Sequence, residues 1–152
     1  MTFNEVLQIL TGSIGSFGFA LLFNVRGKRV LVATLGGLLS WLIFLLLSRF
    51  IDSEPINYFI VSLLITVYAE VMARVMKTPT TTFITTSLIP LIPGSSLYYT
   101  MAYAFQSDMS RFVEKAVYTL ELAAALALGV IAATAATKLF YNGLHAATKP
   151  RG

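Results

Sequence analysis

The chain has 152 residues and a formal charge of +4, and 57% of its residues are hydrophobic while only 12% are charged. Soluble domains carry about twice that share of charge, roughly 25%, and a soluble domain this small cannot bury so much apolar surface. The composition therefore argues against a soluble enzyme, a disordered tail and a nucleic-acid-binding module. The sequence contains no cysteine, which excludes disulfides and thiolate metal sites.

Five apolar stretches of 18 to 24 residues follow one another along the chain, at residues 3–23, 30–47, 56–76, 83–105 and 117–140. As helices they would be roughly 27–36 Å long, which matches a hydrocarbon core of about 30 Å. Segments in lipid must satisfy their own backbone hydrogen bonds. We therefore predict an all-α integral membrane protein, with residues 1–152 forming a single transmembrane domain of about five helices. The predicted connections are residues 24–29, 48–55, 77–82 and 106–116.

Lysine and arginine residues are distributed unevenly between the two sides of the predicted bundle. One side carries Arg26, Lys28, Arg29, Arg74, Lys77, Lys138, Lys149 and Arg151, and the other carries Arg49, Arg111 and Lys115. Cytoplasmic loops are the ones enriched in these residues. We therefore expect a multi-pass protein of the cytoplasmic (inner) membrane, with its N-terminus outside and its C-terminus in the cytoplasm.

Small residues recur at helical spacing within the predicted helices. Gly12 and Ser16 lie four residues apart in the first stretch, Gly37 lies in the second, and Gly129 and Ala133 lie in the fifth. Helices in lipid associate where small side chains let their backbones approach closely. We interpret these ridges as helix contacts, and an interface that moves is the alternative.

The fourth stretch is interrupted near its centre by Pro90 and by Pro93-Gly94. Each proline removes a backbone donor and clashes with the preceding turn, so the helix should break close to the bilayer midplane. Broken backbone persists there only when it is buried in protein or lines a water-filled cavity. A half-helix capped by Ser95 or Ser96 would offer free N–H groups to an anion. The candidate substrate-binding residues are Thr86, Pro90, Pro93, Gly94, Ser95 and Ser96. A simple packing kink is the alternative.

A polar ridge in the third stretch contains Thr66, Glu70 and Arg74, spaced four residues apart. A carboxylate inside a spanning segment costs several kcal/mol unless it is paired or faces water, and Glu70 and Arg74 are spaced to pair. Either they form a structural ion pair, or the ridge belongs to a polar, proton-exchanging pathway. Glu121 either reaches the outer headgroups or is a second acidic station. Acidic residues on both sides of a midplane site would fit proton-coupled exchange.

The sequence predicts no cofactor and no metal site. It contains no cluster of metal ligands, no phosphate-binding loop and no nucleophile–base pair. We therefore expect a protein that is not an enzyme and that does not bind nucleic acid.

Two segments carry a resemblance to a known family. Residues 69–79 read AEVMARVMKTP, and residues 90–98 read PLIPGSSLY. In this order they resemble the threonine/serine exporter family, and in particular its smaller, second-half component. Residues 18–28 resemble the first-loop signature of the family, which usually has proline where this chain has Arg26. The residues that match the family pattern are Glu70, Arg74, Lys77, Pro79, Pro90, Pro93 and Gly94.

The resemblance implies a secondary exporter of threonine and serine, or of dicarboxylates such as succinate in split, two-component members. It also implies a larger membrane subunit as partner, beside lipid and a small anionic or zwitterionic solute. The alternative is a structural subunit that assembles or positions a partner holding the substrate site. A homo-oligomer is the other assembly left open.

Overall fold

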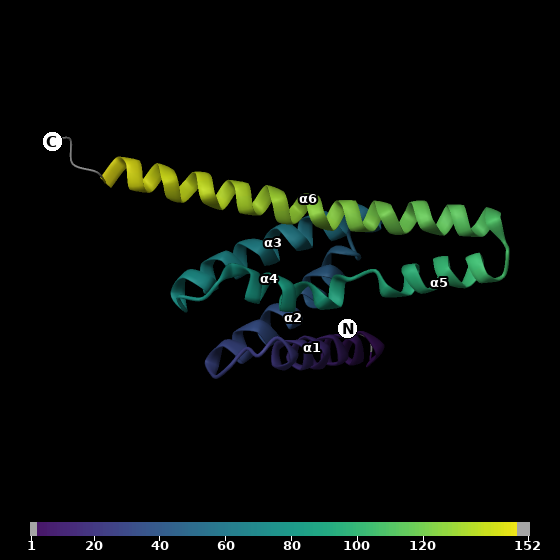
Figure 1. Cartoon of the computed structure of the whole chain (residues 1–152), viewed down its shortest axis with the longest axis horizontal. Helices are drawn as coiled ribbons and strands as arrows, with labels where there is room; N and C mark the ends of the chain where they lie inside the picture. Colours follow the sequence, from purple (N-terminus) through teal and green to yellow (C-terminus); the bar gives the residue numbers. More distant parts are fainter. Residues whose placement is uncertain (1–2, 149–152) are drawn as a thin grey trace.

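The computed structural model describes the backbone of residues 3–148 and the side chains as far as Tyr141. All regular secondary structure in the described residues is helical, which confirms the predicted all-α fold (Figure 1). In chain order the elements are α1 (Phe3–Leu22), α2 (Lys28–Leu47), α3 (Glu54–Val75), α4 (Thr80–Leu88), the 3₁₀ turn η1 (Ile89–Leu91), α5 (Gly94–Phe105) and α6 (Met109–Thr148).

Four helices in the described residues are long and apolar enough to cross a membrane, namely α1, α2, α3 and α6. The fourth predicted stretch is broken as expected. It consists of α4 with 9 residues and α5 with 12 residues, separated by η1 and Pro93. Neither piece reaches the length of about 20 residues that a spanning helix needs.

Helices α3 and α6 lie side by side and run in the same direction. The Tyr118 hydroxyl of α6 donates a hydrogen bond to the Glu54 carboxylate at the start of α3. At the far end, the Arg74 guanidinium lies 3.8 Å from the centroid of the Tyr141 ring. Between them, Gly129 of α6 contacts the backbone of Phe59. The two helices therefore pack against each other along the whole of α3.

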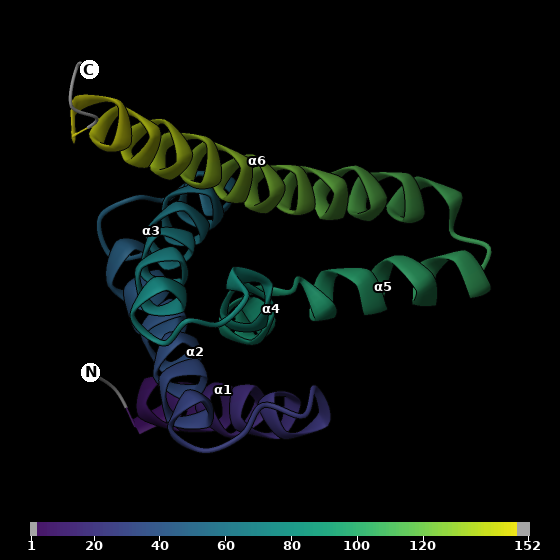
Figure 2. The ribbon, with the colours of Figure 1, turned by 60° about the vertical axis from the view of Figure 1, so that its left-hand side comes forward.

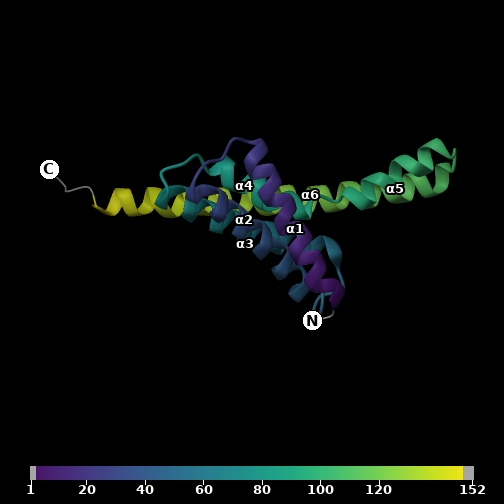
Figure 3. The ribbon, with the colours of Figure 1, turned by 90° about the horizontal axis from the view of Figure 1, so that it is seen from below.

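Helix α5 packs mainly on α6 and forms an antiparallel hairpin with it. The closed end of this hairpin, formed by α5 and the first part of α6, extends away from α1–α4 (Figures 1 and 2), and it protrudes when the molecule is seen from below (Figure 3). Helices α1 and α2 form a second hairpin, and α4 lies against both α2 and α3. The molecule thus combines a bundle of four helices, α1–α4, with the projecting α5–α6 hairpin.

Helix α6 begins earlier than the sequence suggested. Residues 106–116 were predicted as a connection, but only Gln106–Asp108 separate α5 from α6. Asp108 caps the new helix, because its Oδ1 accepts a hydrogen bond from the Arg111 N–H at 3.2 Å. The charged residues of this segment lower its hydropathy without opposing helix formation. At 1.5 Å per residue, the 40-residue α6 is about 60 Å long, twice the hydrocarbon core.

Three helices end in the same way, with a residue in the left-handed conformation. These residues are Asn24, Lys77 and Ser107, with φ of 57°, 48° and 58°. After α1, the Val25 N–H donates to the Ala20 carbonyl at 2.9 Å and the Asn24 N–H to the Leu21 carbonyl at 2.9 Å. The same pair of bonds follows α3 and α5. This Schellman arrangement satisfies the last carbonyls and fixes the direction of each loop.

Small residues lie where the helices approach most closely, as predicted. A Cβ atom on Gly37 of α2 would lie 1.9 Å from Ser16 Oγ of α1. A Cβ atom on Gly129 of α6 would lie 2.5 Å from the Phe59 carbonyl oxygen of α3. No larger side chain fits at either position without moving a helix.

Candidate functional site

A cavity of about 230 Å³ opens where the chain is broken between η1 and α5. We call it the break pocket. Its walls come from the first turns of α3, the start of α5 and the first half of α6. It is lined by Glu54, Tyr58, Pro93, Ser95, Ser96, Tyr99, Lys115, Tyr118 and Leu122.

The start of α5 presents unpaired backbone amides near this pocket. Pro93 is the N-cap residue, and no side chain caps the helix. The prediction that Ser95 or Ser96 would act as the cap is therefore wrong, because α5 begins before them, at Gly94. The Gly94 N–H donates to the Ile92 carbonyl at 2.7 Å and the Leu97 N–H to the Pro93 carbonyl at 3.0 Å. The Ser95 and Ser96 amides lie between these two, in the first turn, where a helix has no carbonyl partners to offer.

Hydroxyl groups join α5 to α6 beside the pocket. The Thr119 hydroxyl donates to the Lys115 carbonyl at 2.7 Å, so it accepts the bond that joins it to Ser96 Oγ at 2.7 Å. The Thr100 hydroxyl donates to the Ser96 carbonyl at 2.9 Å. We call Ser96, Thr100 and Thr119 the hydroxyl seam. With its own hydrogen committed to Thr119, the Ser96 hydroxyl can only accept from a ligand.

The break pocket also contains one acidic and one basic side chain. The Glu54 carboxylate accepts a hydrogen bond from the Tyr118 hydroxyl, and Lys115 Nζ lies 5.5 Å from the centroid of the Tyr118 ring. Sequence reasoning missed both charged residues because it placed them in loops. The nearest signal was Ser53-Glu54-Pro55, which resembles a helix start. A pocket with free amides, an ammonium and a carboxylate is suited to a small zwitterion.

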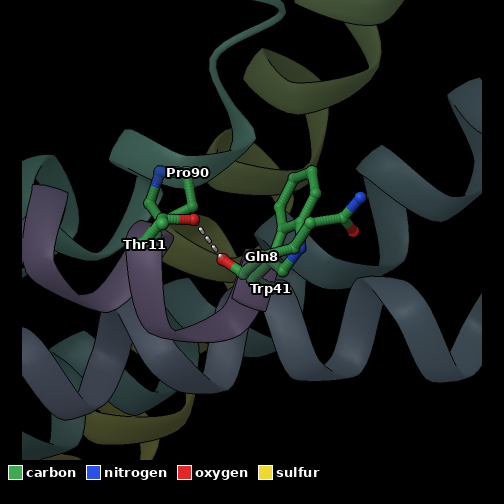
Figure 4. Close-up of a pocket in the computed structure, with 5 residues that line it drawn as sticks. Gln8, Thr11, Trp41 and Pro90 are labelled. Atoms are coloured by element: carbon green, nitrogen blue, oxygen red, sulfur yellow. Dashed lines mark hydrogen bonds between the residues drawn. The ribbon is translucent and has the colours of Figure 1, made fainter. Parts of the chain in front are cut away.

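Two of the predicted site residues lie elsewhere. Pro90 faces α1 and α2, where it lines a separate cavity of about 210 Å³ with Gln8, Thr11, Gly12 and Trp41 (Figure 4). A Cβ atom on Gly12 would lie 3.4 Å from Pro90 Cβ, so this proline packs on α1. Thr86 is buried, and its hydroxyl donates to the Thr82 carbonyl of its own helix at 2.8 Å. The break pocket therefore gathers Pro93, Ser95 and Ser96, with Gly94 exposed beside them.

The break lies level with the first turns of α3, since Pro93 shares its pocket with Glu54 and Tyr58. The sequence had suggested a position near the middle of a span. That expectation treated residues 83–105 as one centred segment. Helix α4 already starts at Thr80, and the 3₁₀ turn rises by about 2.0 Å per residue. Helix α4 and the 3₁₀ turn together run back along most of the length of α3 before the chain reaches the break.

The predicted ion pair in α3 is formed. Arg74 Nη1 lies 2.9 Å from Glu70 Oε2 and donates to the Glu70 carbonyl at 2.9 Å. Glu70 is only 6% exposed, and Thr66, one turn away, is buried with no hydrogen-bond partner for its hydroxyl. Glu70 lies 16 residues from Glu54 on the same helix, about 24 Å from the break pocket. Glu121 lies exposed on α6.

Comparison with known proteins adds one finding. A family model described as "Threonine/Serine exporter, ThrE" matches residues 8–136. No curated protein and no solved structure matches the chain. The match includes all of α2–α5, the break pocket and the Glu70–Arg74 pair.

Proposed function

Because this chain belongs to the threonine/serine exporter family, we propose that it is a membrane subunit of a secondary exporter of threonine and serine, or of dicarboxylates such as succinate. The family consists of transporters and not enzymes. The observation that supports a substrate site in this chain is the break pocket, where the uncapped start of α5 meets Lys115 and Glu54.

In this proposal the solute is held by its charged groups. Its carboxylate accepts hydrogen bonds from the Ser95 and Ser96 amides at the positive end of the α5 dipole. The Lys115 ammonium adds an attractive charge from α6. The ammonium of an amino acid lies toward Glu54. A dicarboxylate has no such group, so Glu54→Gln should favour succinate over threonine.

A larger membrane subunit would complete the site. Ile92 is 57% exposed, and Gly94 and Ser95 are exposed beside it. Irregular backbone at membrane depth must be covered by protein or line a cavity. We propose that the larger subunit covers this face of the break. A second copy of this chain in the same place would instead make the exporter a homo-oligomer.

The arrangement of the loops supports an orientation. The loops after α1 and α3 meet at one end of the bundle, where the Arg29 guanidinium donates to the Met76 carbonyl at 3.4 Å. At the opposite end Arg49 pairs with Glu5 at 2.7 Å. We propose that the protein lies in the cytoplasmic (inner) membrane and that the first end faces the cytoplasm. Lys149, Arg151 and both chain termini lie outside the described residues.

Proton coupling is the remaining part of the proposal. We assign the proton to Glu70, with Arg74 and the free Thr66 hydroxyl beside it and Glu121 as a second acidic station. The competing interpretation is a structural ion pair that holds α3 against α6. The charge swap Glu70→Arg with Arg74→Glu separates the two, because it restores the pair but moves the carboxylate. Folded protein with no proton-driven export supports coupling, and full export contradicts it.

Counterflow in liposomes that contain both subunits tests the substrate site. We expect Lys115→Met to reduce exchange of labelled threonine or succinate at least tenfold, since a charge-assisted hydrogen bond contributes about 1.5–3 kcal/mol. Lys138→Met on the same helix is the matched control, because Lys138 does not line the pocket. Wild-type exchange by the larger subunit alone would instead show that this chain only assembles or positions its partner.

A further inference from the structure

A second cavity, of about 300 Å³, lies at the other end of the bundle from the break pocket. We call it the loop pocket. One wall is the loop between α1 and α2 with the first turn of α2, and the other is the loop between α3 and α4 with the first turn of α4. It is lined by Phe23, Asn24, Val25, Arg26, Arg29, Thr78, Pro79 and Thr82.

Both walls are held in place from beneath. Val25 is 7% exposed and belongs to the same apolar cluster as Ala73 and Phe83, so the first loop is anchored on α3 and α4. The Schellman bonds after α1 and α3 fix the two loop backbones. The cavity is therefore part of the folded structure of this chain.

The two arginines of the loop pocket have no carboxylate partner in the described residues. The arginines that form ion pairs in the described part of the chain are Arg49 with Glu5, Arg74 with Glu70 and Arg111 with Asp108, and none of them lines the loop pocket. Arg26 Nε donates to Asn24 Oδ1 at 3.0 Å, and Arg29 Nη2 donates to the Met76 carbonyl at 3.4 Å. Each guanidinium has five N–H donors, so most of them remain free for a ligand.

The surrounding sequence supplies no negative charge to offset these cations. Residues 6–51 and 71–107 contain no aspartate and no glutamate. Lys28, the first residue of α2, and Lys77, in the loop after α3, add to the positive potential. The one acidic residue on the facing part of α3, Glu70, is already paired with Arg74.

Threonine hydroxyls extend the polar surface from the loop pocket along α4. A neighbouring cavity of about 210 Å³ shares Phe23 and Thr82 with it and adds Thr81 and Thr85. Thr82 and Thr81 lie three and four residues before Thr85, so all three lie on the same side of α4. They offer hydroxyl donors to a ligand that the arginines attract.

We propose that the loop pocket binds an oxyanion, held by Arg26 and Arg29 and by the threonine hydroxyls of α4. The planar guanidinium fork matches the oxygens of a carboxylate or a phosphate and binds them in pairs. The group belongs either to a soluble anion or to an anionic lipid headgroup. This is a binding site separate from the break pocket, and the proposal does not require that the protein transports anything.

The test uses the full chain purified with any subunit that accompanies it. In lipid-free detergent, binding of succinate and of inorganic phosphate is measured by calorimetry. In nanodiscs of phosphatidylcholine with and without phosphatidylglycerol, retained lipid is measured by native mass spectrometry. The variants are Arg26→Gln with Arg29→Gln, and Arg26→Lys with Arg29→Lys. Lys28→Gln is the matched control, since it removes one charge from the first turn of α2, next to Arg29 but outside the pocket.

We expect the glutamine pair to weaken binding at least tenfold, the lysine pair to weaken it less, and Lys28→Gln to change it less than twofold. Loss of succinate and phosphate binding identifies a soluble anion as the ligand, and loss of retained phosphatidylglycerol identifies a lipid headgroup. Absence of all three ligands from the wild-type protein overturns the proposal. An equal loss in folded Lys28→Gln also overturns it, because attraction would then depend on net charge alone.

Discussion

The four-helix bundle and the α5–α6 hairpin are built on different contacts. In the bundle, glycines at crossing points bring backbones together, as at Gly37 against Ser16. In the hairpin, α5 has a single buried residue, Thr100, and Phe105 is 84% exposed. The bundle therefore depends on close helix crossings, whereas α5 leaves most of its apolar surface to lipid or to another chain.

The largest effect should follow when the bundle is forced away from α6. Gly129→Leu places a side chain where even a Cβ would lie 1.9 Å from Ser62 Oγ and 2.5 Å from the Phe59 carbonyl oxygen. Overpacking of this kind typically costs up to about 3 kcal/mol. Thermal unfolding in detergent should show this loss. Gly15→Leu is the matched control, because a Cβ there meets nothing within 4 Å. Equal stability of the two variants would contradict the packing described for α3 and α6.

A smaller effect is expected at the crossing of α1 and α2. Gly37→Ala should cost about 1–3 kcal/mol, since its Cβ would lie 2.4 Å from Ser16 Cβ. Ser16→Gly removes the obstructing side chain, so the double variant should recover most of the loss. A thermodynamic cycle of the four proteins measures this coupling. Additive losses would mean that the two residues do not compete for the same space.

The hairpin should respond in geometry more than in stability. Thr119→Val removes the acceptor of the Ser96 hydroxyl and should cost about 1 kcal/mol, while loosening α5 from α6. Because the chain has no cysteine, spin labels on cysteines at Leu97 and Leu120 can report a broader distance distribution. Thr137→Val serves as control, since that hydroxyl bonds only to its own helix, at 3.0 Å and 3.1 Å. An unchanged distribution for Thr119→Val would show that the hydroxyl seam does not hold the hairpin.

The smallest effect on stability belongs to Gly94→Ala. A Cβ at this position meets nothing within 4 Å, and the residue has no positive φ. The free energy of unfolding should change by less than about 0.5 kcal/mol. Counterflow should nevertheless fall if a solute approaches the start of α5. Unaltered counterflow would place the solute away from this helix end.

The sequence predicted the helical class, the break and the close-packed glycines because each follows from local chemistry. Proline at residues 90 and 93 removes a backbone donor and clashes with the preceding turn in any context, so it kinks or breaks a helix. Spacings of four residues align Ser62, Thr66 and Glu70 on one face of α3 whatever surrounds it. These features need no knowledge of the neighbouring helices.

The extent of α6 and the composition of the break pocket could not be predicted in the same way. Hydropathy marks where a helix is apolar, so it predicted a start of α6 at Val117, although Asp108 caps the helix and α6 begins at Met109. With that turn misplaced, Lys115 and Tyr118 could not be brought to Glu54. Pro90 and Pro93 line different cavities, and this separation depends on tertiary packing. Residues three apart in a continuous 3₁₀ helix share one face. The break between these two prolines removes that relation, so spacing alone could not predict their neighbours.

The common direction of α3 and α6 has a consequence for topology. The chain leaves α3 at one end of the bundle and must re-enter α6 at the other, so α4, η1 and α5 together complete one full traverse although neither helix is long enough alone. An epitope inserted after Lys77 and another inserted at Ser107 should therefore be labelled from opposite faces of a sealed vesicle.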